Sequence, residues 1–130
     1  MLRMMRKRKL WLLFLGAMFL VFQSFSTLSL SRQDIPENVN DVLQTSCFGC
    51  HNSEGRNDDA KDALELDNWD GYRLTKKIGV LSEIIEVLEE DKMPPARFLE
   101  SNPDRRLTED QKKLVIDWAN EESRRLMEDN

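Results

Sequence analysis

The sequence predicts an all-α fold, and two observations support this prediction. Residues 31–130 contain no alternation of apolar and polar residues of the kind that marks a half-buried strand. Three stretches of the same region instead repeat apolar residues every three or four positions, which places them on one face of a helix. The length of 130 residues suits one domain. We therefore predict a targeting segment, residues 1–30, followed by a single domain, residues 31–130.

The first predicted helix begins near Asp34 and Pro36 and leads into the region of Cys47. Aspartate is favoured at a helix N-cap, and proline suits the first helical turn. The residues expected on its buried face are Val39, Val42 and Leu43.

The second predicted helix has the most regular pattern. Its expected buried face repeats at alternating spacings of four and three: Leu74, Ile78, Leu81, Ile85 and Leu88. Ile84 and Val87 widen this face. We expect the helix to end within Glu89–Asp91, because the prolines of the following Met93-Pro94-Pro95 cannot continue it.

The third predicted helix begins at Thr108, and Gln111 three residues later completes a capping box. Its expected buried residues are Leu114, Val115 and Trp118. The charged tail from Glu121 onward is expected to lie in solvent. Residues 52–70 are polar and rich in Asn, Asp and Gly, which predicts a loop between the first two helices, with or without a short helix.

Residues 1–30 differ in character from the rest of the chain. Five basic residues and no acidic one precede or accompany an apolar run over residues 10–22, which is typical of a secretory signal. Cleavage near Ser24/Ser26 or Ser29/Ser31 is one outcome, and an uncleaved apolar helix over residues 10–30 that anchors the protein in the inner membrane is the other. Both place the domain outside the cytoplasm, in the periplasm, because the basic residues stay on the cytoplasmic side.

Without residues 1–30 the chain keeps 14 basic and 24 acidic residues, a net charge of −10. This charge argues against binding to nucleic acid, whose phosphates need a basic surface. It suits docking onto a basic face of a partner protein, because complementary potentials speed encounter. A role in solubility alone would also explain this net charge.

The only two cysteines lie in Cys47-Phe48-Gly49-Cys50-His51. This spacing is the attachment motif of a c-type haem. Two thiols that face one edge of a porphyrin can add to its two vinyl groups, and the adjacent histidine then lies beneath the iron. We expect Gly49 to keep the turn between the thiols uncrowded. The motif predicts one covalent haem on Cys47 and Cys50, with His51 as an iron ligand.

Three other uses of these residues fit the sequence less well than haem attachment. A disulfide between Cys47 and Cys50 closes a very short loop and yields little entropic stabilisation. A thioredoxin-like redox pair needs a strand followed by a helix, which the pattern does not predict. A structural zinc site needs four protein ligands, whereas the chain offers two cysteines and one histidine.

Methionine is the expected second axial ligand, because His51 is the only histidine in the chain. Four of the six methionines lie in residues 1–30, which leaves Met93 and Met127. Met127 lies in the charged tail, whereas Met93 follows the most regular helix and precedes two prolines that stiffen its loop. Met93 is therefore our candidate. Filling of the core and a vacant sixth position are the alternatives.

Several further residues could contact the haem. Trp69 and Tyr72 could pack on the porphyrin edge, bond to a propionate or belong to the core. The side chains that could pair with propionates are Arg73, Lys76 and Arg97. The acceptor for the ring N–H of His51 is not evident from the sequence.

The motif Cys47–His51, the segment Met93-Pro94-Pro95 and the stretch from Leu107-Thr108-Glu109 to Trp118 together resemble the small c-type haem-binding domains of exported bacterial proteins, which belong broadly with class I cytochromes c. The resemblance covers about residues 36–120. It implies a small helical domain around one covalent haem, with Cys47, Cys50, His51 and Met93 in the roles given above. Many class I cytochromes have a proline soon after the motif whose carbonyl accepts from the axial histidine, and this chain has none between Cys50 and Met93.

The expected function is one-electron transfer in the bacterial cell envelope, since the chain shows no catalytic constellation and we do not expect an enzyme. The expected partners are redox proteins and the host's haem-maturation machinery. Two alternatives stay open. A peroxidase-type enzyme needs an open face and an acid–base group beside the iron. A gas sensor or binding module needs a displaceable Met93.

Overall fold

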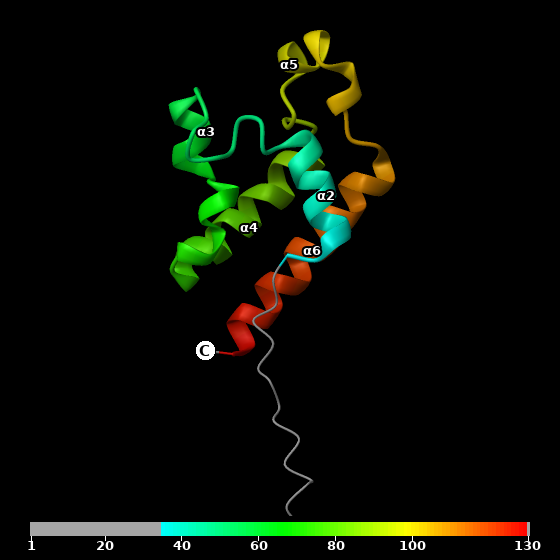
Figure 1. The fold of residues 1–130 in the computed structure, drawn as a ribbon. Helices are drawn as coiled ribbons and strands as arrows, with labels where there is room; N and C mark the ends of the chain where they lie inside the picture. The colour runs from blue at the N-terminus through cyan, green and yellow to red at the C-terminus, as the bar shows by residue number, and fades with distance from the viewer. Residues whose placement is uncertain (1–34, 130) are drawn as a thin grey trace, which may run out of the picture. The chain divides into compact units, whose positions relative to one another are not determined.

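Helices are the only regular secondary structure in residues 35–129, which are the residues that the computed structural model describes (Figure 1). The predicted all-α class is therefore confirmed for this region. The predicted targeting segment with its apolar helix, and Asp34 as a helix cap, lie outside the described residues. Within residues 35–129, no helix combines the length and apolar character needed to cross a membrane.

The first predicted helix corresponds to α2, which spans Glu37–Ser46. Pro36 stands at its N-cap position, and the fixed φ of proline suits this place. The three residues expected on its buried face, Val39, Val42 and Leu43, are buried. Cys47 follows as the C-cap, with its backbone N–H donating to Leu43 O at 2.9 Å. The helix therefore delivers the cysteine motif directly at its end.

The second predicted helix is α4, which spans Leu74–Glu89. Its observed buried residues are Val80, Leu81 and Leu88, so the predicted stripe is only partly correct. Val80 was not predicted, and Leu74, Ile78 and Ile85 are half-buried. The reason is that α4 packs on two sides. One side lies against α6, and Val80, Ile84 and Val87 line a pocket on the other.

The third predicted helix is α6, which spans Glu109–Glu128 and carries the predicted capping box. The Thr108 hydroxyl accepts from the Gln111 N–H at 3.2 Å, and the Gln111 side chain accepts from the Thr108 N–H at 2.9 Å. The prediction of a wholly solvated tail is wrong at Glu122, which is buried and pairs with Arg125 at 2.6 Å.

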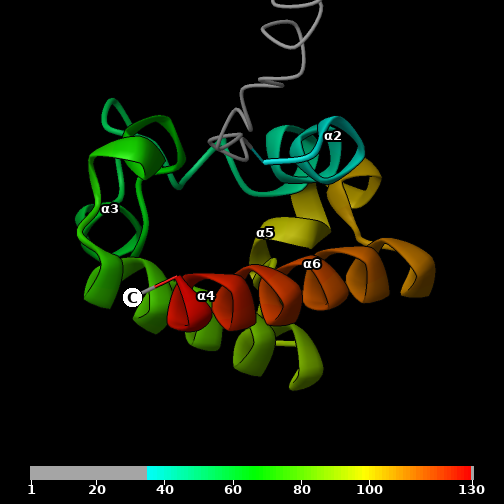
Figure 2. The same ribbon diagram turned by 90° about the horizontal axis from the view of Figure 1, so that it is seen from below.

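Four short elements complete the domain. The predicted loop contains α3, Asp58–Ala63, and a 3-10 helix η2, Leu66–Gly71. Between α4 and α6 lie α5, Ala96–Ser101, and a second 3-10 helix η3, Pro103–Arg105, neither of which was predicted. Figures 1 and 2 both show α3 near the beginning of α4, and Figure 1 shows α5 beyond the end of α4.

Two clusters of buried side chains form the core. One joins α2 to the end of α4 and the first half of α6, with Val39, Leu43 and Val115 at its centre. The other lies between η2, the first half of α4 and α6, and contains Leu81 and Ala119, both fully buried. Because α4 and α6 contribute to both clusters, their contact fixes one wall of the pocket described below.

The exposed residue Gly79, in the middle of α4, offers a test of how much the helix contributes to stability. A Cβ added at Gly79 would meet no other atom within 4 Å. Gly79→Ala should therefore raise the free energy of unfolding of the protein by roughly 0.5–1 kcal/mol, because glycine loses more backbone entropy than alanine in a helix. Denaturant unfolding measures the change.

Leu81→Ala in the same helix is a control that should change stability in the opposite direction. Leu81 is fully buried and does not line the pocket, so its truncation should cost about 2–5 kcal/mol. A loss of stability in Gly79→Ala would contradict the placement of Gly79 on the open face of α4.

Candidate functional site: a haem pocket

Two adjoining pockets lie among α2, α3, α4 and the segment that follows α4. The larger encloses about 670 Å³ of space with its open mouth included, and the smaller about 490 Å³. Four residues line both: Cys47, His51, Leu88 and Met93. The two spaces therefore meet at the residues that the sequence singled out.

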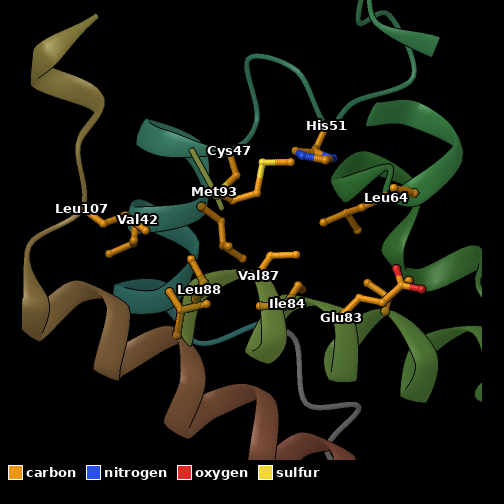
Figure 3. Close-up of a pocket in the computed structure, with 14 residues that line it drawn as sticks. Val42, Cys47, His51, Leu64, Glu83, Ile84, Val87, Leu88, Met93 and Leu107 are labelled. Atoms are coloured by element: carbon orange, nitrogen blue, oxygen red, sulfur yellow. The ribbon is translucent and has the colours of Figure 1, made fainter. Parts of the chain in front are cut away.

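The walls of the larger pocket are almost entirely apolar. Figure 3 shows Ile84, Val87 and Leu88 of α4 beneath it, with Val42 and Leu107 to one side. His51 and Leu64 lie toward the other side, and Met93 lies between the two groups in this view. Glu83 is the only acidic side chain in the lining. An apolar slot with a few polar groups at its rim is the usual form of a cofactor site.

The cysteine motif continues α2 by one further turn. The N–H groups of Cys50 and His51 both donate to the carbonyl of Cys47, at 3.1 Å each. Residues three and four positions apart lie on the same face of a helical turn. The turn therefore directs Cys47, Cys50 and His51 toward one space, and all three line the smaller pocket.

Both cysteines are free thiols in this structure. Burial, and to a smaller extent the neighbouring Cys50, raises the pKa of Cys47 to about 11. Cys47 is therefore protonated at neutral pH, which is the reverse of the activated thiolate in a dithiol redox pair. The described residues also contain no group of three His, Cys, Asp or Glu side chains arranged to hold a metal ion. The protonated thiol of Cys47 counts against a dithiol redox pair.

The ring of His51 is held by a helix that the sequence did not clearly predict. His51 Nδ1 lies 2.9 Å from the carbonyl oxygen of Ala60 in α3. A carbonyl only accepts, so Nδ1 carries the proton and Nε2 keeps its lone pair for a metal. Ala60 thus supplies the acceptor for the His51 ring that the sequence did not identify. Asn57, which caps α3, was the sequence signal for this short helix.

The loop that carries α3 is closed at its base. The N–H of Leu66 donates to the carbonyl of His51 at 3.0 Å, and the N–H of Ser53 donates to Asp67 at 3.0 Å. The hydrogen bond from the Ser53 hydroxyl lowers the pKa of Asp67 below its ordinary value. Gly55 is needed here, because a Cβ at this position would lie 2.6 Å from the Cys50 carbonyl oxygen. This role of Gly55 is not evident from the sequence, because it depends on how closely the folded loop approaches Cys50.

Met93 reaches the pocket from the turn that ends α4. The N–H groups of Lys92 and Met93 both donate to the carbonyl of Val87, at 2.9 and 3.3 Å. This turn brings Met93 back along the helix, and its side chain remains 36% exposed. Met127, the other candidate, is 59% exposed near the end of α6 and lines neither pocket. Of the two candidates, only Met93 lies beside His51.

Other residues from the sequence analysis lie elsewhere. Trp69 is buried against Trp118 and Tyr72, at ring-centroid distances of 5.9 and 6.1 Å, so it belongs to the core. The Tyr72 hydroxyl accepts from the Glu65 N–H at 2.7 Å. A Cβ at Gly49 would meet no atom of the chain within 4 Å, so crowding within the chain does not explain this glycine.

The candidate partners for propionates, Arg73, Lys76 and Arg97, line neither pocket. Lys76 Nζ instead donates to the carbonyls of Asp62 and Ala63, at 3.1 and 3.2 Å. Lys76 therefore closes the end of α3 beside the larger pocket, because Ala63 is part of the lining.

A small helical domain with an apolar slot, and a histidine whose Nε2 is left free for a metal, defines a haem-binding protein. Comparison with protein families agrees, because the model of the haem-binding domain matches residues 56–121, half of the chain. The chain belongs to this family. Comparison with curated proteins and with solved structures finds no match.

The family match and the cysteine motif are independent observations. The matched residues begin after His51 and include α3, α4 and Met93. The residues around the pocket fit a haem on chemical grounds, since they combine an apolar lining, a histidine nitrogen and a thioether sulfur.

The apolar wall of α4 can be tested by filling it. Val87→Trp places a large ring where Val87 lines the pocket, and we expect the haem-to-protein ratio to fall by about half or more, because packed sites tolerate added volume poorly. Absorbance of the purified protein measures the ratio.

Glu86→Trp is the matched control, because Glu86 is exposed on the neighbouring position of α4 and lines neither pocket. Equal haem content in the two variants would mean that this wall does not contact the haem.

Proposed function

We propose that the protein is a c-type cytochrome that transfers single electrons through one haem, bonded to Cys47 and Cys50 and ligated by His51 and Met93. The observation that carries the proposal is that His51 and Met93 line the same two pockets, and that both thiols lie on the turn that holds His51. A bound haem supplies an iron that accepts and releases one electron.

The arrangement of the motif supports covalent attachment. Cys47, Cys50 and His51 share one face of a helical turn, so two bonds to the porphyrin edge are compatible with a histidine beneath the iron. Cys47 as a neutral thiol and the absence of a disulfide keep both sulfurs available for attachment.

Electron transfer suits the surroundings of the proposed ligands better than substrate chemistry. The walls of the larger pocket, which His51 and Met93 both line, are apolar, and an apolar lining limits reorganisation when the charge on the iron changes. Occupation of both axial positions leaves no open site for peroxide or a gas. A peroxidase-type enzyme or a gas sensor would require release of Met93.

The proposal places the domain in the bacterial envelope, since the basic and apolar character of residues 1–30 is typical of a signal or an inner-membrane anchor. Attachment then depends on the host's haem-maturation machinery. Residues 52–70, which flank His51, hold seven acidic and two basic residues. This excess supports a redox partner with a basic docking face.

The covalent bonds predict that haem stays with the protein after denaturation and extraction with acidic organic solvent. The double variant Cys47→Ser/Cys50→Ser should lose all colour under the same treatment, because its haem is held only by ligation and packing. Both proteins are produced with the maturation machinery and compared by their visible spectra. Complete extraction of haem from the wild-type protein would contradict the proposed attachment.

Met93 as the sixth ligand predicts the weak far-red absorption band of ferric iron bonded to methionine. Met93→Ala should abolish this band, whereas Met127→Ala should keep it, because Met127 lines neither pocket. Rapid binding of carbon monoxide by the reduced wild-type protein would favour the sensor, and peroxide turnover by the wild-type protein would favour the enzyme.

A further inference from the structure

We infer that Asn57 is a positioning residue that sets the reduction potential of the iron by fixing the carbonyl of Ala60 against the ring of His51. The inference rests on the proposed function in one respect, namely that His51 binds the iron. Asn57 also lines the smaller pocket, but its inferred effect on the iron passes through α3 and the Ala60 carbonyl.

α3 depends on local hydrogen bonds because it has little else to hold it. It has six residues, Asp58–Ala63, and none of them is buried. A helix of this length is unstable by itself in water, and an unburied helix gains little from packing. Its end caps therefore decide whether it keeps its geometry.

The N-cap and the acceptor for His51 meet at one residue. The side-chain oxygen of Asn57 accepts from the Ala60 N–H at 3.1 Å. The carbonyl of the same Ala60 accepts from His51 Nδ1 at 2.9 Å and from the Leu64 N–H at 3.0 Å. Loss of the Asn57 side chain therefore releases the N–H of the residue whose carbonyl orients the His51 ring.

The base of the loop confines this effect to α3. The N–H of Leu66 donates to the His51 carbonyl and the N–H of Ser53 donates to Asp67, and neither hydrogen bond involves the side chain of Asn57. Lys76 holds the other end of α3 through the carbonyls of Asp62 and Ala63. A change at Asn57 should therefore loosen the first turn of α3 without releasing the loop.

The hydrogen bond has a predictable effect on the iron. Donation from Nδ1 to a carbonyl raises the basicity of the other ring nitrogen, and a more basic ligand favours the oxidised metal. Weakening of this bond should shift the potential to more positive values. The positive direction of this shift in potential distinguishes the positioning role of Asn57 from a loss of haem or of Met93 ligation.

The test compares three variants of the full, haem-loaded protein by redox titration. Asn57→Ala should change the ratio of reduced to oxidised protein at a fixed potential about three-fold toward the reduced form, about 28 mV for one electron. Asn57→Ser should restore the wild-type value, because serine is an equally good N-cap. Thr108→Ala removes the same kind of cap from α6, which supplies no acceptor to His51, and should leave the potential unchanged.

A second measurement reports the hydrogen bond itself. In the reduced protein, the Nδ1 proton of His51 should exchange with solvent faster in Asn57→Ala than in the wild type or Asn57→Ser, as followed by proton NMR. The inference is overturned if Asn57→Ala has the wild-type potential and exchange rate, or if Thr108→Ala shifts the potential equally. The far-red band of each variant reports the proposed Met93 ligation separately, and the comparison of potentials holds for any sixth ligand.

Discussion

The hydrogen bond from His51 Nδ1 to the Ala60 carbonyl is the constraint on which the site depends. The chain has one histidine, so the tautomer and orientation of this ring decide whether any nitrogen faces the pocket. The bond assigns the proton to Nδ1 and leaves Nε2 free. The loop after the cysteine motif is closed by hydrogen bonds of Leu66 and Asp67, and this closed loop contains the Ala60 carbonyl.

The helix α4 connects this site to the core of the domain. One side of it packs with α6 around Leu81, and the other supplies Ile84 and Val87 to the pocket. Its end returns the chain to Met93 through the carbonyl of Val87. The same helix therefore provides stability, an apolar wall and the position of the proposed ligand, so that a shift of α4 would alter all three.

The sequence predicted those parts of the fold that depend on local patterns. The capping box at Thr108, the start of α4 at Leu74 and the buried face of α2 each follow from a few neighbouring residues. The burial of Val80 and Glu122 depends instead on what packs against the helix. Periodicity in one segment carries no information about a second contact surface, such as the pocket beside α4.

The site likewise contains some residues that a local sequence pattern predicts and others that only the folded chain brings together. Cys47, Cys50 and His51 are recognisable because the haem attachment proposed for them requires a fixed spacing along the chain. The Ala60 carbonyl is not, because every residue has a carbonyl and only the folded loop decides which one meets the ring. The one signal that could have suggested it is the asparagine cap that begins a short helix nine residues before Leu66.

The proposed ligation sets two influences on the iron against each other. Methionine as an axial ligand raises the reduction potential, whereas a hydrogen-bonded histidine and the acidic loop at residues 52–70 favour the oxidised state. With a single histidine in the chain, the potential cannot be adjusted by exchanging Met93 for a second imidazole. The potential can then be adjusted through the loop at residues 52–70. Polar residues of this loop, such as Asn57, lie outside the apolar wall formed by α4.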